Sequence, residues 1–115
     1  LIAVFAAILV GGCSETQEET IENTIRDYYS AYNAEAWEGC LGHIDAANAA
    51  GATMIESTLK TARARTGEVT VESVTNFNIT GSTATADVRI TYGGQSEIKE
   101  YSLVKKDGRW KISWQ

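Results

Sequence analysis

The sequence has no proline, a single histidine and only two cysteines in its 115 residues. Without proline, long proline-rich linkers are excluded, and a chain of this length suits one domain. Structural metal sites made of histidine and cysteine use about four such ligands, which these counts do not provide. We therefore expect neither a metal nor a cofactor.

Phosphate-binding and nucleic-acid-binding features are also missing. The glycine pairs Gly11-Gly12 and Gly93-Gly94 lack the spacing and the lysine of a phosphate loop. The net charge is −5, and residues 1–57 hold nine acidic side chains against one basic side chain. Residues 58–115 hold six acidic and nine basic side chains, which is typical of a mixed-charge sheet. Because the acidic half repels phosphates, we expect no nucleic-acid partner.

No apolar run is long enough to span a bilayer, which takes about 20 residues. The run Leu1–Gly12 is shorter and ends at Cys13, after which residues 14–19 are polar and acidic. Val10, Gly11, Gly12 and Cys13 resemble the cleavage site of bacterial lipoproteins, where a branched residue and two small ones precede a cysteine. The thiol of that cysteine becomes the thioether that carries diacylglycerol.

This pattern predicts that residues 1–12 are a signal peptide, with its basic start missing because residue 1 is Leu. Residues 13–19 are then the lipidated Cys13 and a tether, and residues 20–115 are the folded domain. The expected location is the cell envelope, with the membrane as partner through the lipid on Cys13. One alternative is a membrane-spanning anchor lengthened by upstream residues. Another is a Cys13–Cys40 bridge in a protein without lipid; otherwise Cys40 is a small buried hydrophobe.

Apolar residues at helical spacing predict three helices. These residues are Ile21, Ile25, Tyr28 and Tyr32, then Trp37, Cys40, Leu41 and Ile44, and finally Met54 or Ile55, Leu59 and Ala62. The first helix is expected over residues 20–33 with Thr20 as its cap. The second lies within residues 34–45, and the third covers residues 52–65 and ends at Gly67.

After Gly67 the apolar pattern becomes alternating, which predicts four strands. Turns are expected at Thr80-Gly81-Ser82, Gly93-Gly94 and Asp107-Gly108, and a bulge near Ser73. Ala84 to Tyr92 alternate most regularly and should present one buried face. The sequence therefore predicts an α+β domain, in which three N-terminal helices pack on a curved, four-stranded antiparallel meander.

Taken together, the chain resembles the nuclear-transport-factor-2-like superfamily, and within it small bacterial lipoproteins of unknown function. The resemblance rests on the tyrosine-rich first helix, the short helix with Trp37 and the closing stretch Asp107–Trp114. It covers residues 21–115. It implies a curved sheet that wraps a long helix into a cone with an open pocket. Members include ketosteroid isomerases, polyketide cyclases of the SnoaL kind, dehydratases and non-enzymatic binders, so the fold does not select an activity.

The resemblance implies where catalysis would take place. In enzyme members a pocket carboxylate or histidine removes a proton next to a carbonyl, and tyrosines hold the oxyanion. The candidate bases here are His43 and Asp45. The candidate oxyanion donors are Tyr28, Tyr29 and Tyr32. The alternative is that His43 and Asp45 lie at the surface or cap a turn.

Seven aromatic side chains are candidates to line the pocket: Tyr28, Tyr32, Trp37, Tyr92, Tyr101, Trp110 and Trp114. Core packing is the alternative for all of them, and the two roles overlap because a cone wall is also core. No second pocket carboxylate can be placed, since Asp87 falls on the polar face of its strand.

Three functions follow as hypotheses. The first is a lipid-anchored envelope protein whose cone binds a small apolar ligand or a partner without catalysis. The second is a small isomerase, cyclase or dehydratase that uses Asp45 or His43. The third is a structural envelope component that forms a homodimer through the open sheet face.

Overall fold

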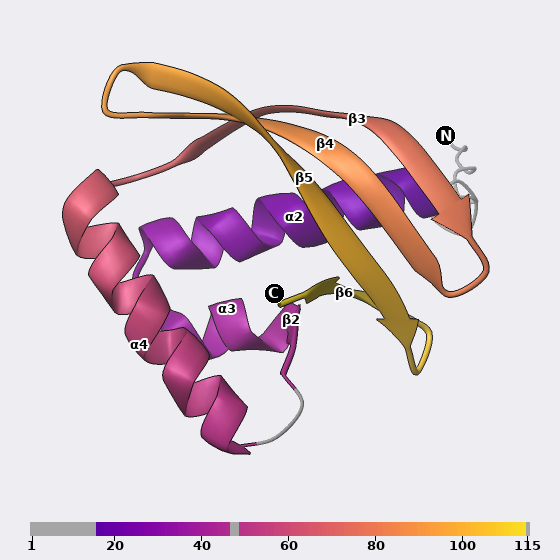
Figure 1. Cartoon of the computed structure of the whole chain (residues 1–115), viewed down its shortest axis with the longest axis horizontal. Coiled ribbons are helices and arrows are strands. Elements are labelled where there is room, and N and C mark those ends of the chain that lie inside the picture. The colour runs from indigo at the N-terminus through magenta and orange to yellow at the C-terminus, as the bar shows by residue number, and fades with distance from the viewer. Residues whose placement is uncertain (1–15, 47–48, 115) are drawn as a thin grey trace, which may run out of the picture.

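The computed structural model describes residues 16–46 and 49–114. Its helices and strands are α2 (Gln17–Asn33), α3 (Trp37–Gly42), β2 (Ile44–Asp45), α4 (Ala49–Thr66), β3 (Thr70–Thr80), β4 (Thr83–Tyr92), β5 (Gln95–Lys106) and β6 (Arg109–Ser113). Figure 1 shows α2 lying between the long strands β3 to β5 and the helices α3 and α4. The predicted α+β class, with helices first and strands after, is confirmed.

The sheet corrects the predicted strand number and topology. It has five strands in the order β2-β6-β5-β4-β3, and β2 pairs with β6 in parallel. The backbone N–H of Ile112 donates to the carbonyl of His43 at 2.8 Å, and Ile44 lies beside Ile112. The prediction of four antiparallel strands was therefore wrong. Ile44 continues the helical spacing of Trp37 and Leu41, but pairing with β6 takes it into the sheet instead.

The start of α2 also differs from the prediction. Thr16 caps the helix, and its side-chain oxygen accepts from the backbone N–H of Glu19 at 3.0 Å. The Glu19 carboxylate in turn accepts from the backbone N–H of Thr16 at 2.9 Å. This reciprocal capping box satisfies two N–H groups and starts the helix before Thr20, so residues 17–19 are helical rather than tether.

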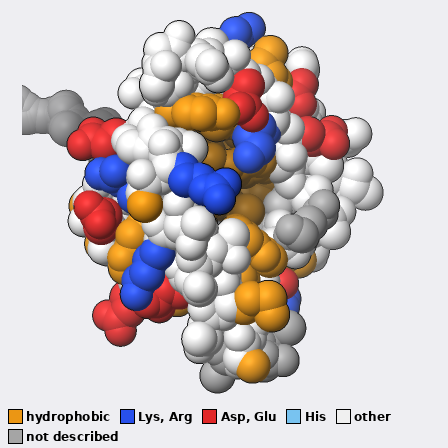
Figure 2. All heavy atoms as spheres, turned by 60° about the vertical axis from the view of Figure 1, so that its left-hand side comes forward, with side chains coloured by type: hydrophobic (Ala, Val, Ile, Leu, Met, Phe, Trp, Pro, Cys, Tyr) orange, Lys and Arg blue, Asp and Glu red, His pale blue; other side chains and the backbone are white. Residues whose placement is uncertain are grey.

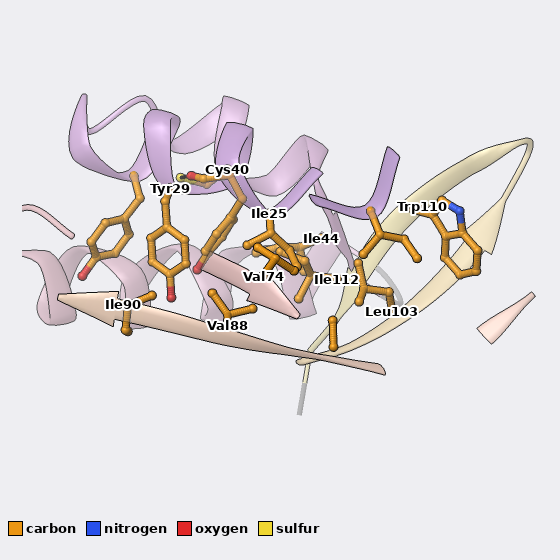
Figure 3. Packing of buried hydrophobic residues seen from close by; sticks show 14 of the residues in the cluster. Ile25, Tyr29, Cys40, Ile44, Val74, Val88, Ile90, Leu103, Trp110 and Ile112 are labelled. Carbon is orange, nitrogen blue, oxygen red and sulfur yellow. Dashed lines mark hydrogen bonds between the residues drawn. The ribbon is translucent and has the colours of Figure 1, made fainter. Parts of the chain in front are cut away.

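The core lies between α2 and the sheet (Figure 3). Ile25 and Tyr29 project from α2 towards Val88 and Ile90 of β4. Both Ile25 and Val88 have no exposed surface, and Ile90 is 3% exposed. The alternation predicted for Ala84 to Tyr92 is confirmed as far as Ile90, because the apolar side chains up to that residue are buried, whereas Tyr92 is half-buried.

Local backbone signals shape the sheet as predicted, with one addition. The register of β3 against β4 shifts at Ser73, and a second shift follows Thr75, where Asn76 has a φ of 55°. Bulges of this kind bend a strand and increase its twist. At the β4–β5 turn, Gly93 and Gly94 have φ values of 56° and 78°, which glycine adopts without strain.

Helix α4 is longer than predicted, and it places Ile55 rather than Met54 against the core. It begins at Ala49 and ends at Thr66, and Gly67 follows with a φ of 74°. Ile55 is 4% exposed, whereas Met54 is 68% exposed. Ile55 therefore belongs to the core, and Met54 is a large apolar side chain in solvent.

Candidate functional site

Five aromatic rings from α2, α3 and β5 form one cluster. The ring centroids of Tyr28 and Tyr29 lie 4.8 Å apart, and those of Tyr29 and Tyr32 lie 5.7 Å apart. Trp37 meets Tyr32 at 6.1 Å, and Tyr101 meets Tyr29 at 6.4 Å. These are favourable separations for aromatic pairs, several of them edge to face. The cluster follows from the spacing on α2, which places Tyr28, Tyr29 and Tyr32 on the buried side.

Three tyrosine hydroxyls of the cluster are hydrogen-bonded within the protein, and its buried phenols stay uncharged. Tyr29 and Tyr101 share a short hydrogen bond between their hydroxyls, and Tyr32 shares one of 3.2 Å with Thr66. Burial raises the pKa of Tyr28, Tyr29 and Tyr101 above the ordinary value for a phenol. These phenols are therefore neutral at physiological pH and offer dipoles rather than charge.

A cavity of about 280 Å³ opens beside this cluster. It lies where β6 ends next to β5, and its lining comes from Tyr28, Lys99, Glu100, Tyr101, Ser102, Ile112, Ser113 and Trp114. Trp114 is 38% exposed, so its indole is partly open to solvent. On the face seen in Figure 2, hydrophobic side chains are visible at the bottom of a hollow with basic and acidic side chains beside it. The cavity combines an aromatic wall with charged groups at its rim.

The structure divides the seven aromatic candidates. Tyr28, Tyr32, Trp37 and Tyr101 lie in the aromatic cluster, and Tyr28, Tyr101 and Trp114 line the cavity. The two others lie elsewhere. Trp110 is 3% exposed, and its indole N–H donates to the side-chain oxygen of Gln17 at 3.2 Å. Figure 3 shows it at the opposite end of the core from Tyr29.

Tyr92 lies close to the turn between β4 and β5. Its hydroxyl donates a short hydrogen bond to the Glu97 carboxylate, which raises the Tyr92 pKa.

Two residues of the site, Tyr29 and Ile112, are not among the seven pocket candidates predicted from the sequence. Tyr29 is adjacent to Tyr28 on the buried side of α2, which could have indicated its place. Ile112 lines the cavity, and the alternation of β6 placed it on the buried face.

The candidate bases lie on either side of the buried Ile44. Asp45 forms an ion pair of 2.8 Å with Lys106, and its side chain is 25% exposed. It lines a more open and more polar depression of about 540 Å³ on the sheet, where hydroxyl side chains such as Thr83 and Thr85 lie beside apolar ones such as Leu103. His43 follows α3 as its C-cap and is half-buried. The Asp45 carboxylate is thus bound to Lys106 of β5, and the Asp45 backbone pairs with β6.

Cys40 is a buried free thiol in the described part of the chain. Its Sγ donates a weak hydrogen bond of 3.7 Å to the Tyr28 carbonyl, and burial raises the pKa of the thiol to about 11. This agrees with its interpretation as a small hydrophobe. Cys13, the predicted lipid attachment site, lies outside the described residues.

Neither a cluster of metal ligands nor a membrane-spanning helix is found among the described residues. Within residues 16–46 and 49–114, no group of three or more His, Cys, Asp or Glu side chains is placed to hold a metal ion. Over the same residues, no helix has both the length and the hydropathy needed to cross a membrane.

A family model for the C-terminal domain of the low molecular weight antigen MTB12 matches residues 41–115, which is more than half of the chain. The chain belongs to this MTB12 family. No curated protein sequence matches it. The matched region of the MTB12 domain begins within α3 and includes β2, α4 and the whole of the sheet.

Solved structures show the fold of this MTB12-family chain. An NTF2-like transpeptidase from Campylobacter jejuni superposes with a TM-score of 0.62 at 13% identity, covering 83% of this chain and 98% of its own. A variant of the function-unknown protein Rv3472 from Mycobacterium tuberculosis superposes with a TM-score of 0.59 at 20% identity, covering 81% of this chain and 65% of its own. A SEC-C motif protein, RPA3114 from Rhodopseudomonas palustris, superposes with a TM-score of 0.58 at 20% identity, covering 79% of this chain and 73% of its own. The fold is nuclear-transport-factor-2-like, as the sequence resemblance implied.

Proposed function

We propose that this MTB12-family chain is a non-enzymatic binding protein of the cell envelope, whose pocket takes a small, uncharged and largely apolar ligand. The observation that carries the proposal is the cavity lined by Tyr28, Tyr101, Ile112 and Trp114. An apolar cavity with a few polar groups at its edge is the usual form of a small-ligand site. At about 280 Å³ it suits a compact ligand of one or two rings.

The chemistry of the wall supports an uncharged ligand. The Tyr28 side chain is buried and that of Tyr101 is half-buried, and burial raises the pKa of each phenol, so neither carries a charge that would bind an ion. Their rings offer flat apolar contact at a low cost in side-chain entropy. The charges at the opening belong to Lys99 and Glu100, which have opposite sign. The pocket therefore has no net preference for an anion or a cation.

The placement of the acidic groups favours binding over catalysis. A general base must lie within hydrogen-bond reach of the proton that it removes. Asp45 is held by Lys106 at 2.8 Å and faces the polar depression instead of the cavity. Glu100 is the one carboxylate among the residues that line the cavity, and it is exposed. Neither is a carboxylate buried inside the cavity, which the isomerase hypothesis would need.

The lipid anchor is the second part of the proposal. Because α2 begins at Gln17, the three residues between Cys13 and the helix reach at most about 14 Å when extended. A lipid on Cys13 would thus hold the start of α2 close to the bilayer surface. Lys105 donates to the Gln17 side chain at 3.2 Å, so the basic β5–β6 hairpin lies at the same end. That arrangement would bring the hairpin near the lipid headgroups.

We predict that Trp114→Ala weakens ligand binding about tenfold, because the indole supplies roughly 1–2 kcal/mol of apolar contact. The probe is N-phenyl-1-naphthylamine, an uncharged aromatic compound whose fluorescence increases in apolar sites. The measurement is a fluorescence titration of the whole chain in mild detergent, with detergent alone as the blank. Met54→Ala is the matched control, since Met54 is 68% exposed on α4 and lines none of the cavity. Equal probe binding by both variants would contradict the proposal.

A further inference from the structure

One long stretch of β5 has a partner on one side only within the described sheet. β5 pairs with β4 from Gln95 to Val104. Its pairing with β6 covers only Leu103 to Lys106. Figure 1 shows β5 continuing past β6 towards the β4–β5 turn. Such an edge offers a row of backbone N–H and C=O groups to another strand.

The register identifies the backbone groups that face this edge. The N–H of Lys105 donates to the carbonyl of Ser82, just before β4, at 2.8 Å, so this N–H points towards the β4 side of β5. Because the direction alternates along a strand, the odd-numbered residues of β5 bond to β4 and the even-numbered residues face the other side. The N–H and C=O groups of Ser96, Ile98 and Glu100 therefore point out from the open edge.

Side chains around Ile98 suit an extended strand with the same sequence. Ile98 is 57% exposed, which makes it one of the large apolar side chains left in solvent. Its neighbours Glu97 and Lys99 have opposite charges and project to the opposite face of the sheet from Ile98. One carboxylate oxygen of Glu97 accepts from the Tyr92 hydroxyl, and the other is left for a further partner.

We propose that a second copy of this chain pairs with the edge of β5 in antiparallel orientation, about a two-fold axis at Ile98. In this register each Ile98 exchanges both backbone hydrogen bonds with its copy, and the two side chains pack together. Glu97 of each copy then lies opposite Lys99 of the other. Two oppositely charged pairs and one apolar pair all stabilise the same register.

Other symmetric registers are disfavoured by charge. An axis at Glu97 places two glutamates opposite each other, and an axis at Lys99 places two lysines opposite each other. An axis at Glu100 again opposes two carboxylates, and directly opposed like charges destabilise a strand pair. An axis at Ser96 opposes two small side chains and leaves Ile98 across from Gly94. Of these axes, only the one at Ile98 places Glu97 opposite Lys99 without opposing like charges, and Glu100 then lies opposite Ser96.

This contact adjoins the opening of the binding pocket, where Lys99 and Glu100 lie, and it differs from a dimer through the sheet face. It uses backbone groups of Ser96 to Glu100, so it does not depend on a ligand between Tyr28 and Trp114. An extended segment of a different protein could use the same backbone groups by strand addition. The self-complementary charges of Glu97 and Lys99 favour a second copy, and the experiments below separate the two partners.

The first experiment reverses the charges. Sedimentation equilibrium of the whole chain in density-matched detergent should show a monomer–dimer equilibrium. Lys99→Glu should raise the dissociation constant at least about tenfold, because it opposes like charges at two symmetric positions. Glu97→Lys should do the same, and the double variant Glu97→Lys/Lys99→Glu should restore dimerisation. Lys60→Glu, on α4, is the control for charge alone.

The second experiment tests the register. The Cα atoms of a hydrogen-bonded antiparallel pair lie about 5.5 Å apart, within the range that a disulfide spans. Ile98→Cys should therefore form a covalent dimer on mild oxidation. Ser96→Cys should not, since its own copy lies about 13 Å away along the strand. Together, Ser96→Cys and Glu100→Cys chains should cross-link to each other.

Three results would overturn the proposal. The first is a wild-type chain that stays monomeric at high concentration. The second is a double charge variant whose dimer dissociation constant is as high as that of the single variants. The third is equal cross-linking of Ser96→Cys and Ile98→Cys. Circular dichroism spectra check that each variant is folded. Cross-linking of Ile98→Cys to a foreign protein instead of to itself would assign the edge to a different partner.

Discussion

Replacing Ile25 with alanine should lower the free energy of unfolding by about 3 kcal/mol. Ile25 has no exposed surface and lies between α2 and β4, where it faces Val88 (Figure 3). Removing three carbon atoms there loses apolar burial and leaves a cavity that rigid neighbours cannot fill. The measurement is urea unfolding, followed by circular dichroism and by tryptophan fluorescence.

Met54→Ala is the matched control for this experiment. It removes the same number of heavy atoms from a helix, and methionine and alanine both favour helical conformation. Because Met54 is 68% exposed, its replacement should change stability by less than about 0.5 kcal/mol. If Ile25→Ala were no more destabilising than Met54→Ala, the packing of α2 against the sheet would be wrong.

Replacing Cys13 with serine should release nearly all of the protein from the membrane. A serine hydroxyl cannot form the thioether that carries diacylglycerol. The two or three acyl chains of a lipoprotein anchor it stably, so the variant loses its anchor together with them. The chain would be expressed in a bacterium behind a complete signal-peptide start. Ultracentrifugation then separates membrane-bound from released protein, and mass spectrometry of the N-terminus identifies the lipid.

Cys40→Ser is the control for this second prediction. Cys40 is a thiol within the fold, with no exposed surface, and cannot accept the lipid. That variant should stay in the membrane fraction, although burying a hydroxyl lowers its stability. Membrane-bound Cys13→Ser protein, or an unmodified Cys13 after an intact leader, would contradict the lipoprotein proposal.

Much of the sheet could be predicted from sequence because its signals are local. Ala84 to Ile90 alternate over one strand, which is enough to identify the buried face. Gly93-Gly94 and Asp107-Gly108 mark tight turns through their backbone freedom, and both occur where expected. The bulge at Ser73 was visible as a slip in the apolar alternation.

Two features of the fold differ from the prediction. One depends on a residue far away in the sequence, and the other depends on a local capping motif. Ile44 joins the sheet because β6 offers it a strand about 70 residues later, which no local spacing reveals. The start of α2 was missed for a different reason. Thr16 and Glu19 form a capping box that is legible in the sequence, whereas the apolar spacing alone predicts a start at Thr20.

The site was predictable to the extent that it lies on one helix. The spacing of Tyr28 and Tyr32 placed both on the buried side of α2, and they do meet. The alternating pattern places Trp110 and Trp114 on one face of the closing strand, but Trp114 follows the end of β6. Trp110 therefore packs at the start of α2 beside Gln17, whereas Trp114 reaches the cavity. Sequence spacing alone cannot show which end of a strand meets a pocket.

The most direct test of the proposed pocket is a two-dimensional ¹H–¹⁵N NMR titration that follows the indole N–H signals with N-phenyl-1-naphthylamine. The three tryptophans serve as reporters at different places. The Trp114 signal should shift, because this indole lines the cavity. The Trp110 signal should stay in place, since its N–H is bonded to Gln17 at the other end of α2. A titration that moves Trp110 as much as Trp114, or moves neither, would contradict a binding pocket at this site.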